Sequence, residues 1–479
     1  MRSVLFPFTV LFLFLCVDLH SVFAQYDHYL LKDYMNPDYK RQSLDFSFNG
    51  NFSNSSNKRD GSHPEYTYKD ALDQIKMTGG LSLGYNRIKN TIRTQNNTSV
   101  DFLFNGNYGK DKSFTDTQGA NSYNYNQDRL SKTGMVRVGL DFRNTGYYYG
   151  NNKNFLLLGP TAGFSYSHGN YKLDDKTNTS YKNTTRDLSA HAAFSLGIGK
   201  GRIEEVGDAR QAVYLLQDLQ KYGILEKELS QEEIDELARL VTKVKNKRQF
   251  DSRIRLIQEI TSVDSLLIEK GYIGKEHSAA YFTTLYDNWQ YANVNRRSGN
   301  RFTVSLRPFV VYSHYKIEKT WLYDNNPAEH DTTKYFDYGG NFVVSFDSEK
   351  PVNLYWQRAL SIEFTTEWRE SDYPKHSERY HSLLSADYGW VYYPNSRTSI
   401  GGFFSELLAY TYKERQFQTS TSLLFDLKYY FSPQLRLNIS YRFGYTYIRS
   451  DDKDTDWLVT SRNKYPDNFL SINLMYSIF

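Results

Sequence analysis

A stretch near the C-terminus alternates strictly between two kinds of side chain. From Gln434 to Tyr447, odd-numbered residues are apolar or aromatic, and even-numbered residues are polar or glycine. Successive side chains of a β-strand point to opposite sides, so this pattern predicts a strand with one apolar and one polar face. Strands of soluble sandwiches usually have about five or six residues. The longer run favours a tilted strand that crosses a membrane.

The same alternation recurs along most of the chain, in residues 44–52, 136–143, 188–198, 360–369, 384–392 and 417–429. Charged residues on the polar faces cannot lie unpaired in a dry core, but they can line a wet interior. A soluble sandwich could instead place them on its solvated outer faces. Strand length favours an all-β, antiparallel transmembrane barrel of about 14 strands. We expect its two halves at residues 41–202 and 299–479.

The N-terminus predicts export. Residues 1–24 show the layout of a cleavable signal peptide, with Arg2, an apolar run from Leu5 to Val17, and Ala24 before the cleavage point. Cys16 is the only cysteine, so the mature chain would have no disulfide, Cys-ligated zinc or thiol nucleophile. No later apolar run is long enough for a membrane-spanning helix.

Composition supports a membrane barrel and argues against a nucleic-acid partner. The chain has 42 Tyr and 31 Phe, and aromatic residues favour strands and membrane interfaces. The formal net charge of +4 is small and dispersed, so no nucleic-acid partner is expected. No cofactor is expected either.

The connections are predicted to alternate in length. Short turns are expected at residues 347–351, 393–396 and 431–434, and long polar loops at residues 53–70, 109–131, 172–186, 322–334 and 450–464. Outer-membrane barrels have short periplasmic turns and long external loops. The short turns and the N-terminal segment 25–40 are therefore assigned to the periplasm.

Residues 203–298 interrupt the strand pattern and predict a helical insert. Asp208 is expected to cap a first helix that ends at Gly223. Ser230 to Glu233 forms a capping-box sequence for a second helix. A third would bury Ile257 and end at Gly271, and residues 278–291 are a candidate for a fourth. Strand parity places the insert on the periplasmic side, either below the barrel or folded into it as a plug.

The chain resembles bacterial outer-membrane β-barrel proteins of the porin-like kind. The resemblance rests on the signal peptide, the alternating strands, and a last strand whose apolar face is formed by Leu470, Ile472, Leu474 and Tyr476 before a terminal Phe479. It implies a location in the cell outer membrane, surrounded by outer-membrane lipid. Richness in Tyr and Asn suggests the Bacteroidetes type.

In that family the C-terminal aromatic belongs to the signal that the barrel-assembly machinery reads, so Phe479 and Tyr476 are assigned to it. Family members usually place the final aromatic on the apolar face. Here the residues two and four before Phe479 are Ser477 and Met475. The assembly signal is therefore recognisable but imperfect.

Ten charged residues are predicted to line the lumen because they share the polar faces of their strands. They are Arg137, Asp141, Arg143, Glu363, Glu367, Arg369, Asp426, Lys428, Arg436 and Arg442. Such residues could bias which solutes pass. Alternatively, they could form ion pairs that stiffen a filled barrel.

No catalytic or metal-binding motif stands out, and the chain is not expected to be an enzyme. His168 and His191 could meet on adjacent strands as the base of a barrel hydrolase, but ordinary polar side chains are the simpler interpretation. The sequence favours a porin-like channel for polar solutes. The alternative is a non-conducting anchor whose helical insert recruits a periplasmic protein.

Overall fold

The computed structural model describes twelve stretches of the chain, and the following statements concern those alone. They are residues 29–63, 66–119, 124–175, 180–246, 252–276, 278–291, 296–321, 327–372, 377–412, 415–432, 435–452 and 459–476. The predicted signal peptide and Phe479 lie outside them.

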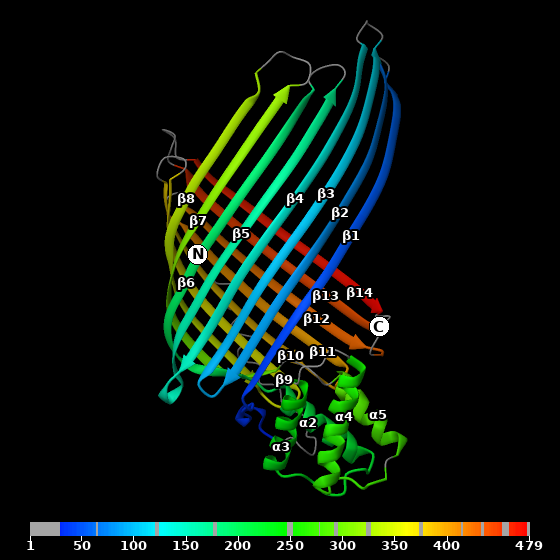
Figure 1. The fold of residues 1–479 in the computed structure, drawn as a ribbon, viewed down its shortest axis with the longest axis vertical. Coiled ribbons are helices and arrows are strands. Elements are labelled where there is room, and N and C mark those ends of the chain that lie inside the picture. Colours follow the sequence, from blue (N-terminus) through cyan, green and yellow to red (C-terminus); the bar gives the residue numbers. More distant parts are fainter. Residues whose placement is uncertain are drawn as a thin grey trace.

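Fourteen strands form one antiparallel sheet in which every strand pairs with its neighbours in sequence. The first eight strands are β1 (Tyr39–His63), β2 (Tyr66–Thr91), β3 (Thr94–Gly119), β4 (Asn124–Tyr149), β5 (Asn154–Asp175), β6 (Tyr181–Glu205), β7 (Arg297–Trp321) and β8 (Glu329–Pro351). The last six are β9 (Trp356–Ser371), β10 (Ser377–Tyr392), β11 (Thr398–Thr411), β12 (Gln416–Tyr430), β13 (Leu435–Asp452) and β14 (Val459–Tyr476). The sheet curls into a barrel (Figure 1).

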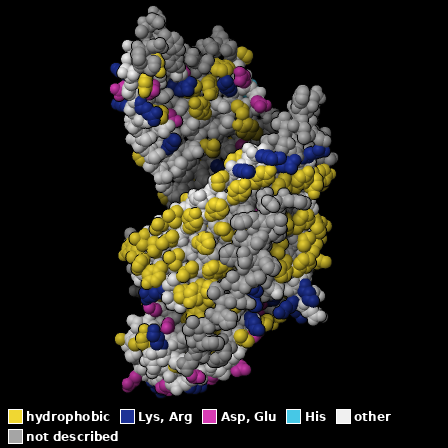
Figure 2. Space-filling model, turned by 180° about the vertical axis from the view of Figure 1, so that it is seen from behind, with side chains coloured by type: hydrophobic (Ala, Val, Ile, Leu, Met, Phe, Trp, Pro, Cys, Tyr) yellow, Lys and Arg dark blue, Asp and Glu magenta, His cyan; other side chains and the backbone are white. Residues whose placement is uncertain are grey.

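The register brings the apolar sides of all fourteen strands onto one face, which we call the apolar face. One hydrogen-bonded row runs through Phe46, Leu83, Phe102, Leu140 and Phe164 on β1 to β5. A second row on β9 to β13 is formed by Leu360, Tyr388, Phe404, Leu423 and Phe443. Figure 2 shows hydrophobic side chains in a broad band around the outside, with Lys and Arg above and below it.

This arrangement is that of a transmembrane β-barrel. An outward apolar band needs hydrocarbon around it, and the antiparallel ladders satisfy the backbone polar groups inside the membrane. The predicted fold class is confirmed, and a bacterial barrel of this kind belongs in the outer membrane. The opposite face of the sheet, which we call the polar face, lines the inside of the barrel.

The strands fall into two length classes. β1 to β8 have 22 to 26 residues, whereas β9 to β14 have 14 to 18. The long strands therefore extend beyond the short ones at the end away from the helices (Figure 1). We call these extensions the wall: residues 53–63, 66–74, 109–119, 124–132, 168–175, 181–187, 314–321 and 329–335.

The prediction of long loops in this region was wrong. β1 and β2 pair as far as His63 and Tyr66, and β7 and β8 as far as Lys319 and Glu329. β13 and β14 likewise pair as far as Asp452 and Val459. The wall is polar on both faces, so it lacks the alternation that marks a strand in the sequence. Its backbone ladders nevertheless continue from the membrane-spanning part.

The helical insert lies between β6 and β7. Its helices are α2 (Gly207–Lys221), α3 (Gln231–Lys245), α4 (Ser252–Glu269) and α5 (Ala279–Tyr291). Short 3-10 turns, η1 (Leu31–Asp33) and η2 (Asn151–Lys153), lie elsewhere. Figure 1 shows the four helices beyond the end of the sheet, which we call the helical end. The insert therefore does not fold into the barrel as a plug. None of the described helices combines the length and apolarity that a membrane span requires.

Local signals in the insert were largely interpreted correctly. The capping box at Ser230 and Glu233 is present, and Gly223 and Gly271 have the positive φ of helix ends. Two details were wrong. Asp208 lies inside the first turn of α2 and does not cap it; its carboxylate instead binds Thr242 and Lys245 of α3. Ile257 is 58% exposed, because α4 buries Val263 and Leu267 instead.

Candidate functional site

The structure places all ten predicted charged residues on the polar face. Arg137, Asp141 and Arg143 lie on β4, in rows that exclude the apolar residues between them. The other seven lie on β9, β12 and β13, again opposite the apolar rows. The ten residues therefore form two groups, one on β4 and one on β9, β12 and β13, and not one compact cluster. Their action on solutes stays a prediction.

Several of these residues form ion pairs. Arg369 forms a close ion pair with Asp337 on β8, whose side chain is only 3% exposed. Arg442 pairs with Asp467 at 2.7 Å, and both of those side chains are about half exposed. Lys428 lies 3.2 Å from Asp426. The polar face thus combines one carboxylate that depends on its arginine with other charges that remain open to water.

A glycine allows one predicted residue to meet a histidine two strands away. Asp141, Gly163 and His191 form one row across β4, β5 and β6. A Cβ atom on Gly163 would approach His191 Cε1 to 2.2 Å, so a larger residue here would displace the imidazole from its present position. His191 Nε2 lies 3.8 Å from Asp141 Oδ1 across this gap.

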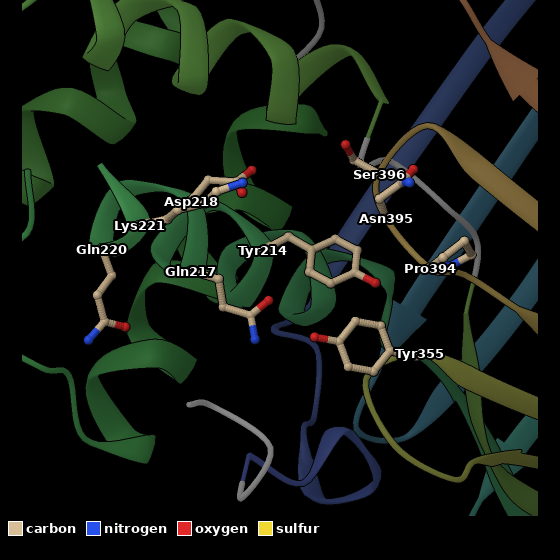
Figure 3. A pocket seen from close by; sticks show the side chains of 9 residues that line it. All are labelled: Tyr214, Gln217, Asp218, Gln220, Lys221, Tyr355, Pro394, Asn395 and Ser396. Atoms are coloured by element: carbon tan, nitrogen blue, oxygen red, sulfur yellow. The ribbon is translucent and has the colours of Figure 1, made fainter. Parts of the chain in front are cut away.

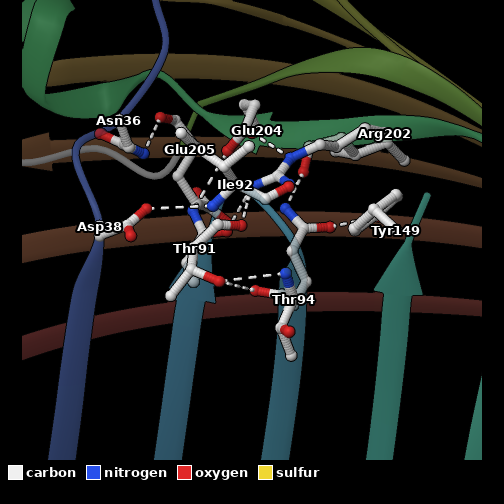
Figure 4. Close-up of polar contacts among 12 residues, drawn as sticks. Asn36, Asp38, Thr91, Ile92, Thr94, Tyr149, Arg202, Glu204 and Glu205 are labelled. Carbon is white, nitrogen blue, oxygen red and sulfur yellow. Dashed lines mark hydrogen bonds and ion pairs between the residues drawn. The ribbon is translucent and has the colours of Figure 1, made fainter. Parts of the chain in front are cut away.

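A polar cluster at the helical end was missed by the sequence analysis (Figure 4). Arg202 of β6 donates to Asn90 Oδ1 at 2.8 Å and to the carbonyl of Ile92 at 2.7 Å. It also forms a close ion pair with Glu204, and both side chains are about 90% buried. We call the side chains of Asn90, Gln95, Tyr149, Arg202, Glu204 and Arg301 the Arg202 cluster.

The Arg202 cluster joins strands that are not neighbours in the sheet. Gln95 of β3 accepts hydrogen bonds from Arg301 of β7 at 2.9 Å and from Tyr149 of β4 at 2.7 Å. Its amide also donates to the carbonyl of Ile203 at 2.8 Å. These contacts cross the concave side of β3 to β7. Side chains, and not open water, therefore fill this part of the helical end.

Backbone geometry explains why Arg202 turns inward. Its strand parity alone would place it on the apolar face, but the preceding Gly201 has φ of +103°. Gly299, on the paired strand, has φ of +124°. Such conformations are readily adopted only by glycine and turn the following side chain inward, while the pairing of β6 with β7 keeps its register from Leu196 to Glu205. The only sequence signal for this cluster was the pair of glycines.

The polar face contains a cavity of about 390 Å³ at the base of the wall, where the wall joins the rest of the barrel. Thr78, Asn107, Met135, Gly169 and Thr185 form one row across β2 to β6. The adjacent row contains Lys76, Gly109, Thr133, Tyr171 and Asn183. Asp111 and Asn183 each place a buried Oδ1 atom here that accepts no hydrogen bond in the described part of the chain. Buried oxygens of this kind call for a donor, which a polar solute can supply.

The insert is fastened to the turns at the helical end. Arg296, fully buried, donates to the carbonyls of Asn353 at 2.8 Å and Trp356 at 2.6 Å, and to Gln357 Oε1 at 3.1 Å. Arg397 pairs with Asp287 of α5 at 2.6 Å. These contacts reach turns from β8 to β11, so the insert and the sheet end form a continuous surface.

The N-terminal segment is part of this junction. Tyr29 donates to Asp235 at 2.5 Å, and the Tyr34 hydroxyl lies 3.3 Å from the Thr242 hydroxyl. Burial raises the pKa of both phenols, and for Tyr29 the hydrogen bond to Asp235 raises the pKa further. The segment before β1 therefore packs in the core of the insert.

A cleft of about 410 Å³ lies between α2 and the turns of the sheet (Figure 3). Tyr214, Gln217 and Asp218 of α2 face Tyr355 and the turn at residues 394–396. Tyr214 donates to the carbonyl of Tyr393 at 3.1 Å, which holds one side of the cleft closed. Gln217 has a buried amide nitrogen that donates no hydrogen bond in the described structure.

The histidine pair does not form. His168 pairs with Arg186 on the apolar face, whereas His191 lies on the polar face. The two rings therefore point to opposite sides of the sheet. Within the described stretches, no group of three or more His, Cys, Asp or Glu side chains is placed to hold a metal ion.

Tyr476 ends β14 opposite Leu435, on the same face as Leu474, and is 65% exposed. That position agrees with the apolar face expected for the last strand. Its part in assembly stays a prediction.

Comparison with known proteins does not assign this chain to a family. No family model matches the sequence, and no curated protein matches it. Among solved structures, the ferric yersiniabactin uptake receptor of Yersinia pestis is 6% identical with a TM-score of 0.33, covering 92% of this chain and 72% of that one. The TodX monoaromatic hydrocarbon channel is 12% identical with a TM-score of 0.26, covering 93% and 92%. The outer-membrane protein OmpT of Vibrio cholerae is 7% identical with a TM-score of 0.23, covering 91% and 99%. These scores are too low to transfer a function.

Proposed function

We propose that this chain is a porin-like channel for polar solutes in the outer membrane. The observation that carries the proposal is the separation of faces, with ten predicted charged residues opposite a continuous apolar face. An interior lined by charges in a water-filled barrel provides a path for polar molecules and a field that selects among them. The cavity with Asp111 and Asn183 supplies hydrogen-bond acceptors along that path.

The proposal includes an orientation. The helical end, with its short turns and the insert, faces the periplasm, and the wall faces the outside. The barrel-assembly machinery reads Phe479 and Tyr476, and outer-membrane lipid surrounds the apolar face. A source among the Bacteroidetes is part of the proposal on composition alone. No catalytic role is assigned, since His168 and His191 point to opposite faces.

Conductance in planar bilayers tests the channel. The purified mature protein is expected to give stepwise ion currents. A matched variant in which a short flexible linker replaces α2 to α5 is expected to conduct more, because the insert narrows the helical end. A folded barrel that conducts in neither form would refute the channel.

A second function is favoured by the junction of insert and sheet. The insert is held by Arg296, Arg397 and the N-terminal segment, and its cleft contains a buried Gln217 amide without an acceptor. A barrel that anchors a rigid periplasmic docking surface would show these features. Cross-linking from a photoreactive residue at Gln220, on the rim of the cleft, should then capture one defined periplasmic protein. Gln258 provides the control position on α4.

A further inference from the structure

Four lysines lie directly opposite one another on neighbouring strands of the wall. Lys110 pairs with Lys132, Lys132 with Lys172, and Lys172 with Lys182 in the ladders of β3 to β6. Like charges placed opposite each other in a sheet are destabilising. A row of four is therefore a costly arrangement unless an anion compensates it.

The protein itself compensates little of this charge. Lys172 lies 3.8 Å from Asp174. Lys110, Lys132 and Lys182 form no ion pair with any described residue. Three of the four side chains are exposed, and Lys110 is partly exposed. The ammonium groups are therefore available to an external anion.

The row has a defined place relative to the membrane. All four lysines belong to the apolar face, since Lys110 follows Tyr108 and Phe104 in the same alternation. Aromatic side chains mark the edge of the hydrocarbon region, and Tyr108, Tyr166 and Tyr312 occupy that edge on β3, β5 and β7. Lys110 thus lies one outward position beyond the edge, at the depth of lipid headgroups. Lys172 lies three outward positions beyond Tyr166, so the row extends outward from the headgroups across the tilted strands.

Other basic side chains continue the same belt. Arg186 of β6 pairs with Lys316 of β7, and His314 of β7 pairs with Lys334 of β8. Each occupies the first or second outward position beyond the apolar band. Acidic side chains on this surface are fewer. They are Asp73 opposite Lys112, Asp174 beside Lys172, and, farther out, Asp116, Asp128 and Glu318. The surface has a positive excess over six adjacent strands.

We propose that this basic belt binds the phosphate groups of anionic membrane lipids, with the row of Lys110, Lys132, Lys172 and Lys182 as its centre. Lysine ammonium groups at a membrane surface attract anionic headgroups, and a phosphate between two lysines turns their repulsion into attraction. Phosphates of an outer-leaflet glycolipid and of a phospholipid share this chemistry. The proposed outward orientation of the wall favours the glycolipid.

The test uses the mature protein in neutral phosphatidylcholine nanodiscs. Three additions are compared: bisphosphorylated lipid A, the same lipid without phosphates, and phosphatidylglycerol. Native mass spectrometry measures retained lipid, and thermal unfolding measures stability. Wild type should retain lipid A and gain stability, and the dephosphorylated lipid should do neither. Equal retention of phosphatidylglycerol would identify any anionic headgroup as the ligand.

The informative variant carries Lys110→Gln, Lys132→Gln and Lys182→Gln. Its matched control carries Lys76→Gln, Lys319→Gln and Lys428→Gln, which remove the same charge from the polar face. The first variant should bind lipid A about tenfold more weakly or worse, whereas the control should bind it as wild type does.

A second measurement, the unfolding temperature in neutral lipid, should change in favour of the variant. In neutral lipid alone, the first variant should unfold about 2 °C higher than wild type, because the repulsion is gone. Lipid A binding by that variant at wild-type strength, or equal retention of dephosphorylated lipid by the wild type, would overturn the proposal. Both readouts are independent of conduction, so they separate this inference from the channel.

Discussion

Charged residues on the polar face differ in how much the fold depends on them. Asp337 is almost fully buried and paired with Arg369, whereas Asp467 and Arg442 are both about half exposed. Removing one partner of a buried pair leaves an uncompensated charge and costs about 3 kcal/mol or more. An exposed pair contributes about 1 kcal/mol at most.

We therefore expect Arg369→Gln to lower the unfolding temperature of the barrel strongly and Arg442→Gln to leave it almost unchanged. Heat-dependent mobility on gels measures both. If the channel proposal holds, each variant also shifts the reversal potential toward cations, since each removes one positive charge from the interior. Equal heat sensitivity of the two variants would contradict the burial argument.

Gly201 provides a test of the Arg202 cluster. A Cβ atom at this residue would lie 2.1 Å from the carbonyl oxygen of Asn300, and its φ is positive. Gly201→Ala should destabilise the barrel by about 2 kcal/mol and displace Arg202. Gly134→Ala is the matched control, because a Cβ atom there meets nothing within 4 Å. Similar unfolding temperatures for the two variants would show that the positive φ at Gly201 is not required.

At the scale of elements, the N-terminal segment is held to the insert by phenols whose pKa values are raised. An unfolded tyrosine ionises near pH 10, and Tyr29 and Tyr34 ionise above that value when packed. The packed form therefore keeps its full stability below pH 10 and loses it as the pH rises further. In the insert, burial and Glu233 raise the pKa of Tyr272 to about 12.

A dye on Lys32→Cys, the sole cysteine of the mature chain, should report this release. Its fluorescence anisotropy should stay high up to about pH 10 and then fall. With Tyr29→Phe and Tyr34→Phe added, the fall should move to higher pH, since those two phenols no longer ionise. A fall near pH 7 would place the cause elsewhere.

Element prediction from sequence succeeded where burial imposed a pattern. The alternation of residues 417–429 and 435–447 reflects hydrocarbon on one side, and Ser230 with Glu233 reflects a local capping requirement. The strands of the wall were not predicted, because both faces of the wall are polar and its sequence therefore lacks the alternation that marks a strand. The ten charged residues could be assigned to a face by parity. The Arg202 cluster could not, because the positive φ of Gly201 turns the next side chain to the face opposite to the one that alternation assigns.

At the scale of the whole molecule, closure of the barrel depends on the two edge strands of the sheet, β1 and β14. The ladders run from β1 to β14, and none joins those two strands within the described residues. Phe48 of β1 is 72% exposed and Leu474 of β14 is 64% exposed. Unpaired backbone inside hydrocarbon is costly. We therefore expect β1 and β14 to pair in the membrane, antiparallel and with their apolar faces matched.

Paired cysteines test this closure in a mature chain that otherwise has no thiol. Leu44→Cys is combined in turn with Leu470→Cys, Ile472→Cys or Leu474→Cys, all on the apolar face. One of the three pairs should cross-link readily in membranes. Ile92→Cys with Ile472→Cys is the control and should stay reduced. Failure of all three pairs would mean that the edges remain apart.

The unequal strand lengths also determine from which side a large solute could reach the interior of the barrel. The eight strands β1 to β8 are long and the six strands β9 to β14 are short, so the rim of the barrel is higher on one side than on the other. In the proposed orientation, the interior is accessible to a large solute over the short strands β9 to β14, and the long strands β1 to β8 block access from the opposite side.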